Sequence, residues 1–108
     1  MAELQPYTPD NWVIVEIADK DTTFYKVLGG WSGGYLDGDS WRMNSGITEV
    51  DEKEDCYLFH GQSGSVYKCW KEAEKTRINM GEPLAIIESN DIAKIVEYKD
   101  IKYKLKQK

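Results

Sequence analysis

Aromatic, basic and amide side chains gather in two short stretches of the chain, where they could stack on flat rings and donate hydrogen bonds. This chemistry holds single-stranded nucleic acid, and each stacked base contributes roughly 1–3 kcal/mol. The candidate residues are Trp31, Tyr35, Trp41, Arg42, Asn44, His60 and Gly61. Each also has an ordinary structural explanation, since the rings can fill a core, Asn44 can satisfy a buried turn and His60 can end a strand.

No motif for catalysis, metal binding or a cofactor is present in the sequence. His60 is the single histidine, no GxSxG occurs, and the glycine-rich segment 29–38 lacks the GK[ST] of a phosphate-binding loop. Cys56 and Cys69 match neither a redox CxxC nor a zinc knuckle, although Cys69 would approach His60 if both lay on one hairpin face. The Asp-Gly-Asp at 37–39 fits a turn better than a cation site. We expect no enzyme, no metal and no cofactor.

The net charge of −5 excludes a protein that coats nucleic acid through bulk electrostatics, because such binding depends on many lysines and arginines. This charge is distributed unevenly: residues 1–56 carry 4 basic against 12 acidic side chains, and residues 57–108 carry 10 against 7. Much of the positive charge lies at 99–108, where lysines alternate with apolar residues and predict an edge strand or a tail. Any polyanion must therefore be bound locally.

Runs of β-branched and aromatic residues predict two hairpins. The predicted elements are a hairpin of Asn11–Ile17 with Thr22–Leu28, a glycine-rich loop or strand corner at 29–40, a strand at 41–50, an acidic turn at 49–55, and a hairpin of 56–60 with 65–70. The second hairpin turns at Gly61–Gly64, and this turn decides which side chains share a face. The face expected to be buried holds Tyr57, Phe59 and Val66. The other face holds Cys56, Leu58, His60, Tyr67 and Cys69.

The pattern is looser after Trp70. Residues 71–79 predict a short helix, 84–87 an apolar strand, and 91–98 either a helix or a strand. A chain of 108 residues has room for one domain, 1–108. Short, bent strands with little helix predict an all-β fold with minor helix, a small SH3-like open β-barrel of about five strands. Because an open barrel leaves an edge strand, a ring or dimer of identical chains is also predicted.

Residues 39–44, Asp-Ser-Trp-Arg-Met-Asn, and residues 58–63, Leu-Phe-His-Gly-Gln-Ser, form two short motifs. In this order they resemble the signatures of the Sm/LSm family, small barrels that form rings and bind single-stranded RNA. The first is similar to Asp-x-x-Met-Asn, with three residues instead of two before the methionine. The second is similar to an apolar-Arg-Gly-polar-polar turn, with His60 in place of arginine and one residue more before Val66.

This resemblance implies an Sm-like barrel and a role for each motif residue. In the family, the asparagine hydrogen-bonds a base, the residue before the methionine stacks on it, and the arginine of the second turn closes the other side. By the resemblance, Asn44 would read a base edge, Arg42 would stack, and His60 with Gly61 would form the opposite wall. Residues 30–42 are also similar to a group of small proteins of marine cyanophages and ocean metagenomes, which implies phage ancestry but no activity.

Two hypotheses about function follow. The first is a ring-forming protein that binds single-stranded RNA or DNA, with a role in phage RNA or DNA processing. The alternative is an acidic protein-interaction module that binds a host protein through residues 49–55 and exposed tryptophans. Neither a signal peptide nor a run of roughly 18 apolar residues is visible, so we expect no membrane partner and a place in the cytoplasm of the infected host cell.

Overall fold

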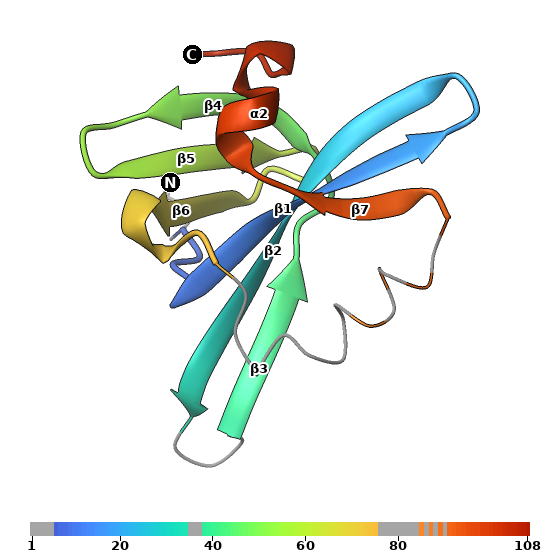
Figure 1. Cartoon of the computed structure of the whole chain (residues 1–108). Coiled ribbons are helices and arrows are strands. Elements are labelled where there is room, and N and C mark those ends of the chain that lie inside the picture. Colours follow the sequence, from blue (N-terminus) through green and yellow to red (C-terminus); the bar gives the residue numbers. More distant parts are fainter. Residues whose placement is uncertain (1–5, 35–37, 76–84, 86, 88, 90) are drawn as a thin grey trace.

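The structure, a computed structural model, describes residues 6–34, 38–75, 85, 87, 89 and 91–108, and this part of the chain is mostly β, as predicted. Its strands form two antiparallel sheets (Figure 1). The four-stranded sheet has the order β3-β2-β1-β7, with β1 at Asn11–Asp19, β2 at Thr22–Gly34, β3 at Gly38–Met43 and β7 at Ala93–Val96. The three-stranded sheet has the order β4-β5-β6, with β4 at Ile47–Glu52, β5 at Cys56–Gly61 and β6 at Val66–Trp70.

The first predicted hairpin is confirmed, and it forms the centre of the four-stranded sheet. Asp19 pairs with Thr22 across a two-residue turn in which Lys20 has a φ of 52°. The apolar run of β1 is buried on both faces of this sheet. Trp12 and Ile14 point into the main core between the two sheets, whereas the side chains that alternate with them join a smaller cluster on the far face, where Ile87 also packs.

The main core takes side chains from both sheets and from a short C-terminal helix. Its largest fully buried members include Trp12, Phe59, Tyr67 and Tyr98. The Phe59 ring lies 5.3 Å from both the Trp12 and the Tyr98 rings, centroid to centroid, in tilted or edge-to-face arrangements. Such aromatic contacts add to the hydrophobic stabilisation of the burial itself. Many of the abundant aromatics therefore serve the core, and fewer are left for a binding surface.

The second hairpin is present, but the predicted division of its faces is wrong. His60 pairs with Val66, one residue beyond the partner that a four-residue turn at 61–64 would give it. A shift of one residue moves every side chain of the following strand to the other face. Tyr67 and Cys69 therefore lie on the core side with Phe59, while Val66 joins His60 on the outer side.

The bounds of several other elements differ from the predicted ones. The glycine-rich segment 29–40 is mostly strand, because β2 runs to Gly34 and pairs with β3 through a register shift between Trp31 and Gly34. The strand predicted at 41–50 is broken at 44–46, between β3 and β4. β4 continues into the acidic run, so the turn at its end is confined to 53–55.

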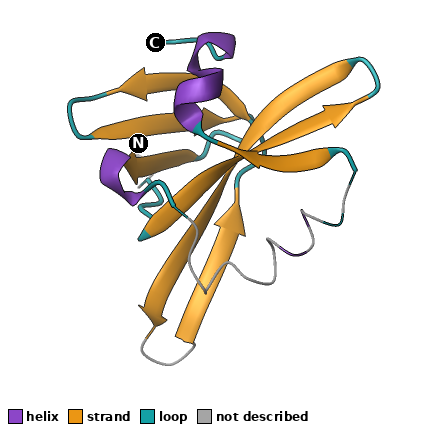
Figure 2. Cartoon of the chain, viewed as in Figure 1, coloured by secondary structure: helices purple, strands orange, loops and turns teal. Residues whose placement is uncertain are grey.

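The region after Trp70 contains less helix than predicted and a different final element. The 3-10 helix η1 covers Lys71–Ala73, and the rest of the predicted helix beyond residue 75 lies outside the described residues. Ala85 and Ile87 have helical backbone, so the strand predicted at 84–87 is wrong at those positions. Of the two alternatives for 91–98, the strand is found, as β7. Figure 2 shows how little of the chain is helical.

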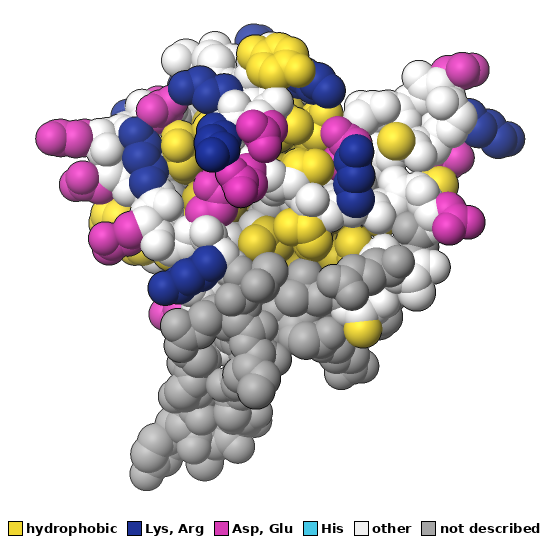
Figure 3. Space-filling view, in the orientation of Figure 1, with side chains coloured by type: hydrophobic (Ala, Val, Ile, Leu, Met, Phe, Trp, Pro, Cys, Tyr) yellow, Lys and Arg dark blue, Asp and Glu magenta, His cyan; other side chains and the backbone are white. Residues whose placement is uncertain are grey.

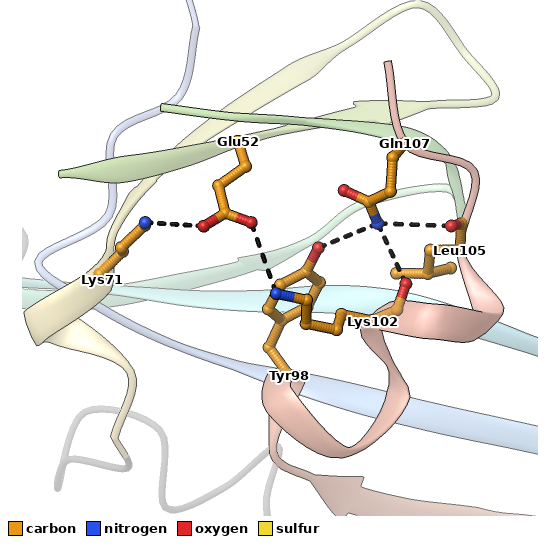
Figure 4. A network of polar contacts seen from close by, with 6 residues as sticks. All are labelled: Glu52, Lys71, Tyr98, Lys102, Leu105 and Gln107. Carbon is orange, nitrogen blue, oxygen red and sulfur yellow. Dashed lines mark hydrogen bonds and ion pairs between the residues drawn. The ribbon is translucent and has the colours of Figure 1, made fainter. Parts of the chain in front are cut away.

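The lysine-rich end at 99–108 is not a loose tail, and its strand character is limited to a β-bridge of Gln107 with Val50 at the β4 edge. It continues from helix α2, Tyr98–Ile101, into the 3-10 helix η3, Lys102–Lys104. Tyr98 and Ile101 are buried, and the Gln107 amide donates to the Tyr98 hydroxyl, to the Lys102 carbonyl and to the Leu105 carbonyl (Figure 4). Burial and hydrogen bonds therefore anchor this end to the core.

Two lysines of this end, Lys99 and Lys102, lie in ion pairs with acidic side chains. Glu52 of β4 lies between Lys71 and Lys102, with N–O distances of 2.8 and 3.7 Å (Figure 4). Lys99 pairs with Glu97 at 3.1 Å. Figure 3 shows basic and acidic side chains interspersed over this face of the molecule. The separation of charge along the sequence is therefore largely lost in the fold.

Both outer edges of the three-stranded sheet are covered by the chain's own end segments. At the β6 edge, the Tyr7 N–H donates to the Val66 carbonyl, and the Lys68 N–H donates to the Tyr7 carbonyl, each at 2.8 Å. At the β4 edge, Val50 exchanges two bonds of 2.8 Å with Lys106 and Lys108. The described strands do not close into a barrel, and the two sheets enclose the main core as separate layers.

Candidate nucleic-acid interface

Arg42 and Tyr7 form a stacked pair that separates two hollows on the surface. Arg42 lies on β3, opposite Gly29 of β2. Its guanidinium carbon is 4.5 Å from the centre of the Tyr7 ring, and its Nη1 donates to the Tyr7 hydroxyl at 3.1 Å. The Tyr7 ring also packs against the Tyr67 ring in a tilted arrangement, with 5.1 Å between the two ring centroids. The arginine is therefore held in place by a ring, and one of its five N–H groups is used in this contact.

The first hollow, which we call the aromatic hollow, has a volume of about 390 Å³. Its described lining residues are Pro6, Tyr7, Thr8, Trp31, Trp41 and Arg42. Trp31 is half-buried and packs on the main core, whereas Trp41 is 46% exposed. Trp41 pairs with Gly30, so strand alternation directs it to the opposite sheet face from Arg42. Trp41 and Arg42 therefore both line this hollow, but they do not face each other as the two sides of one stack.

The second hollow, which we call the polar hollow, has a volume of about 280 Å³ and lies where two loops meet. The loop at 44–46 and the turn after β5 are joined by two bonds of 3.0 Å, from the Gln62 N–H to the Gly46 carbonyl and from the Ser63 N–H to the Ser45 hydroxyl. The residues lining this hollow are Tyr7, Arg42, Met43, Asn44, Ser45, Ser63, Ser65 and Tyr67. The two sequence motifs are therefore neighbours in space.

Asn44 is almost completely buried, with 4% of its surface exposed. Its Oδ1 accepts a hydrogen bond of 2.8 Å from the Val27 N–H, and its own backbone N–H donates to the Val27 carbonyl at 3.0 Å. The Nδ2 atom is buried and has no hydrogen-bond partner among the described residues. The Asn44 amide oxygen thus connects its loop to β2, and the amide nitrogen is a donor without a partner among the described residues.

Gly61 belongs to this cluster and His60 does not. A Cβ atom on Gly61 would lie 3.0 Å from the Ser65 hydroxyl, 3.2 Å from the Ser45 hydroxyl and 3.5 Å from Asn44 Nδ2, so glycine permits the close approach of the two loops. His60 points to the outer face of the three-stranded sheet and lines neither hollow. The expected wall opposite Arg42 is therefore not formed by His60.

Sequence reasoning named part of this cluster and missed the rest. Trp31, Trp41, Arg42, Asn44 and Gly61 come together, while Tyr35 lies outside the described residues. The missed residues are Tyr7, Ser45, Ser63, Ser65 and Tyr67. A signal for the serines was present, since Gln-Ser-Gly-Ser at 62–65 is an unusually donor-rich turn beside Gly61. The position of Tyr7 depends on tertiary packing, which no local pattern encodes.

The electrostatics of the two hollows favour an electron-rich ligand. None of their described lining residues is acidic, and Arg42 is the charged one among them. Burial raises the pKa of Tyr67 to about 12, even though the nearby Arg42 charge opposes the shift. Tyr67 therefore remains a neutral phenol at physiological pH and adds no negative charge to the polar hollow.

A cysteine-histidine pair is not formed. Cys69 lies on the core side of β6 opposite Tyr57, whereas His60 is on the outer side. Burial raises the pKa of the Cys69 thiol well above its usual range, which disfavours the thiolate needed for attack. Both cysteines are free and buried, and they point to opposite faces of the sheet. No group of three or more histidine, cysteine or acidic residues in the described part is placed to hold a metal ion.

Compared with known proteins, the chain matches no family model, and no curated protein or solved structure shows significant similarity to it. Among the described helices, none is long and apolar enough to cross a lipid bilayer. The geometry of the two hollows is therefore the basis for assigning a function.

Proposed function

We propose that the chain binds single-stranded RNA or DNA at the aromatic hollow. The observation that carries the proposal is the fixed Arg42–Tyr7 stack beside the exposed Trp41. Bases stack on aromatic rings and on arginine planes, and an arginine already held in place loses less conformational freedom when it binds. Trp31 provides a further ring within the same hollow.

The acidic composition is compatible with this function because the contact is local. Stacking contributes roughly 1–3 kcal/mol per base and does not depend on net charge. Each phosphate that a single-stranded ligand places against a basic side chain changes the slope of log K against log[salt] by about −0.7. With Arg42 as the charged residue among the described lining residues, we expect a slope of about −0.7, much shallower than that of a basic nucleic-acid-coating protein.

The test is fluorescence anisotropy with U-rich and A-rich oligonucleotides of RNA and DNA at low and moderate salt. Trp41→Ala and Arg42→Ala are each expected to weaken binding by roughly 1–3 kcal/mol. Tyr103→Ala is the matched control, because Tyr103 is 76% exposed on η3 and lines neither hollow. No binding by the wild type, or equal losses in all three variants, would refute the proposal.

The proposal includes assembly into a ring and an Sm-like open barrel, in which the two sheets face each other across the main core without closing. It is supported by the meeting of the two motif-bearing loops and by the core enclosed between the two sheets. The edges limit how such a ring could form, because Tyr7 and Gln107 already cover β6 and β4. A second copy would add at an edge of the four-stranded sheet, β3 or β7, or displace one of these segments. Light scattering tests the assembly, and a strict monomer at high concentration would contradict it.

A second candidate function is an acidic module that binds a basic host protein. A hollow of about 270 Å³ beside the β4–β5 turn supports it, lined by Glu54, Asp55, Trp70, Lys71 and Glu72. Trp70 is 37% exposed there. Capture of a basic protein from host lysate after nuclease treatment, lost in a Glu54→Gln/Asp55→Asn variant, would favour this function. Loss of all partners after nuclease treatment would favour nucleic-acid binding.

A further inference from the structure

We propose that the polar hollow binds a phosphate group and does not read a base edge. The inference extends the proposed function, since the phosphate would belong to the strand whose base stacks in the adjoining aromatic hollow. It gives Asn44 a different role from the one implied by the resemblance. Three properties of the hollow support it: the hydrogen-bonding atoms that are already engaged, those that remain available, and the charge around them.

Reading a base edge through a pair of hydrogen bonds requires a donor and an acceptor on the same side chain. Asn44 cannot present both. Its Oδ1 is engaged by the Val27 N–H at 2.8 Å, in a buried position that fixes the orientation of the amide. The remaining Nδ2 atom is a donor, buried and without a partner among the described residues. Leaving such a donor unpaired is costly, so its natural complement is an acceptor oxygen.

The groups around Asn44 are also donors or can act as donors. The hydroxyls of Ser45 and Ser63 are 3.2 Å apart, and those of Ser63 and Ser65 are 3.3 Å apart, so the three serines form a chain that can reorient its protons. Arg42 lines the same hollow and adds a positive charge with a planar set of N–H groups. Arginine and hydroxyl donors around one small hollow suit the several acceptor oxygens of a phosphate.

The charge of the hollow agrees with this assignment. Its described lining residues include no acidic side chain, and Tyr67 stays a neutral phenol. The close approach of Ser45 and Ser65 across Gly61 concentrates the hydroxyls on one side. Arg42 lines both hollows, so one arginine can contact a base on the aromatic side and the phosphate on the polar side.

The direct test is NMR observation of the Asn44 side-chain NH₂ signals during titrations with separate probes. The probes are inorganic phosphate, a phosphodiester dinucleotide, an oligonucleotide with and without a 5′-phosphate, and the nucleosides uridine and adenosine. We expect the phosphate-bearing probes to shift these signals and the nucleosides to leave them in place. A larger effect of the 5′-phosphorylated strand identifies a terminal phosphate, and equal effects identify an internal one.

A Ser45→Ala/Ser63→Ala variant removes two donors while leaving the Asn44–Val27 bond intact. It is expected to weaken phosphate binding on the order of tenfold. Trp41→Ala should leave inorganic phosphate binding unchanged while weakening the oligonucleotide, so failure of the stacking site and failure of the phosphate site are distinguishable. Thermal unfolding confirms that the variants fold, and Ser63→Ala alone replaces the double variant if that one does not.

Two results would overturn the inference. Nucleosides that shift the Asn44 amide signals while inorganic phosphate does not would show that the hollow reads a base. Phosphate affinity that is equal in the wild type and the serine variant would show that these hydroxyls take no part in binding.

Discussion

Replacing Asn44 by alanine should destabilise the fold, independently of any ligand. The side chain accepts the Val27 N–H at 2.8 Å, and Val27 is completely buried. Alanine would leave that N–H without an acceptor in a place that water does not reach, which costs about 1–3 kcal/mol. The backbone bond from Asn44 to Val27 does not depend on the side chain, so the loss is confined to one hydrogen bond and the packing of the amide.

Urea unfolding, followed by tryptophan fluorescence, measures this loss as a change in the free energy of unfolding. The control is Thr48→Ala, which removes an exposed hydroxyl bonded to the His60 carbonyl and should cost less than about 0.5 kcal/mol. If Asn44→Ala costs no more than this control, the structural role assigned to the amide is wrong. A large cost would also mean that loss of ligand binding in Asn44→Ala cannot by itself identify a contact, which is why the phosphate test uses serine variants.

Three further predictions concern the core and the chain ends. Cys69 should resist thiol reagents in the native state and react only on unfolding, because its buried thiol has a raised pKa; labelling at the rate of a free cysteine would contradict this. Burial raises the pKa of Glu74, so its contribution to stability is present below about pH 4.5 and is lost as the pH rises through the folded-state pKa. Glu74→Gln keeps an oxygen for the Tyr98 N–H, so its melting temperature should exceed that of the wild type at pH 7 and approach it at pH 4; a gap independent of pH would refute the assignment. Removing residues 106–108 uncovers the β4 edge at Val50 and should increase self-association in light scattering above that of the wild type, whereas an unchanged oligomeric state would show that this edge needs no cover.

Local sequence patterns predicted the strands better than they predicted the pairing between strands. The first hairpin was predicted correctly because its apolar runs flank a short polar turn that leaves one natural register. In the second hairpin, the choice between His60–Ser65 and His60–Val66 pairing depends on one residue of the turn, and periodicity alone cannot decide it. That single residue determined whether Tyr67 and Cys69 were assigned to the core.

The C-terminal end shows a different limit. Its alternation of lysine and apolar residues is typical of a strand, yet Tyr98 and Ile101 lie on helix α2 and are buried in the core. Short segments adopt whichever backbone lets their apolar residues reach the core, and packing overrides a pattern of this length. The same limit applies to the candidate site, where Arg42 and Asn44 were found from their motif but Tyr7, which stacks on Arg42, was not.

Tyr7 covers the edge of the three-stranded sheet and also helps to form the candidate site. Its backbone pairs with Val66 and Lys68 of the three-stranded sheet, and its ring supports Arg42 of the four-stranded sheet. Pro9 then packs against Gly29, where a Cβ atom would lie only 2.9 Å from the Pro9 Cβ, so this strand position needs a residue without a side chain. Since Gly29 is also the partner of Arg42 in the β2–β3 register, the N-terminal segment is held at the point where it shapes both hollows. The site is therefore a property of the contact between the two sheets, and loss of the Tyr7 pairing would expose the β6 edge and release Arg42 at the same time.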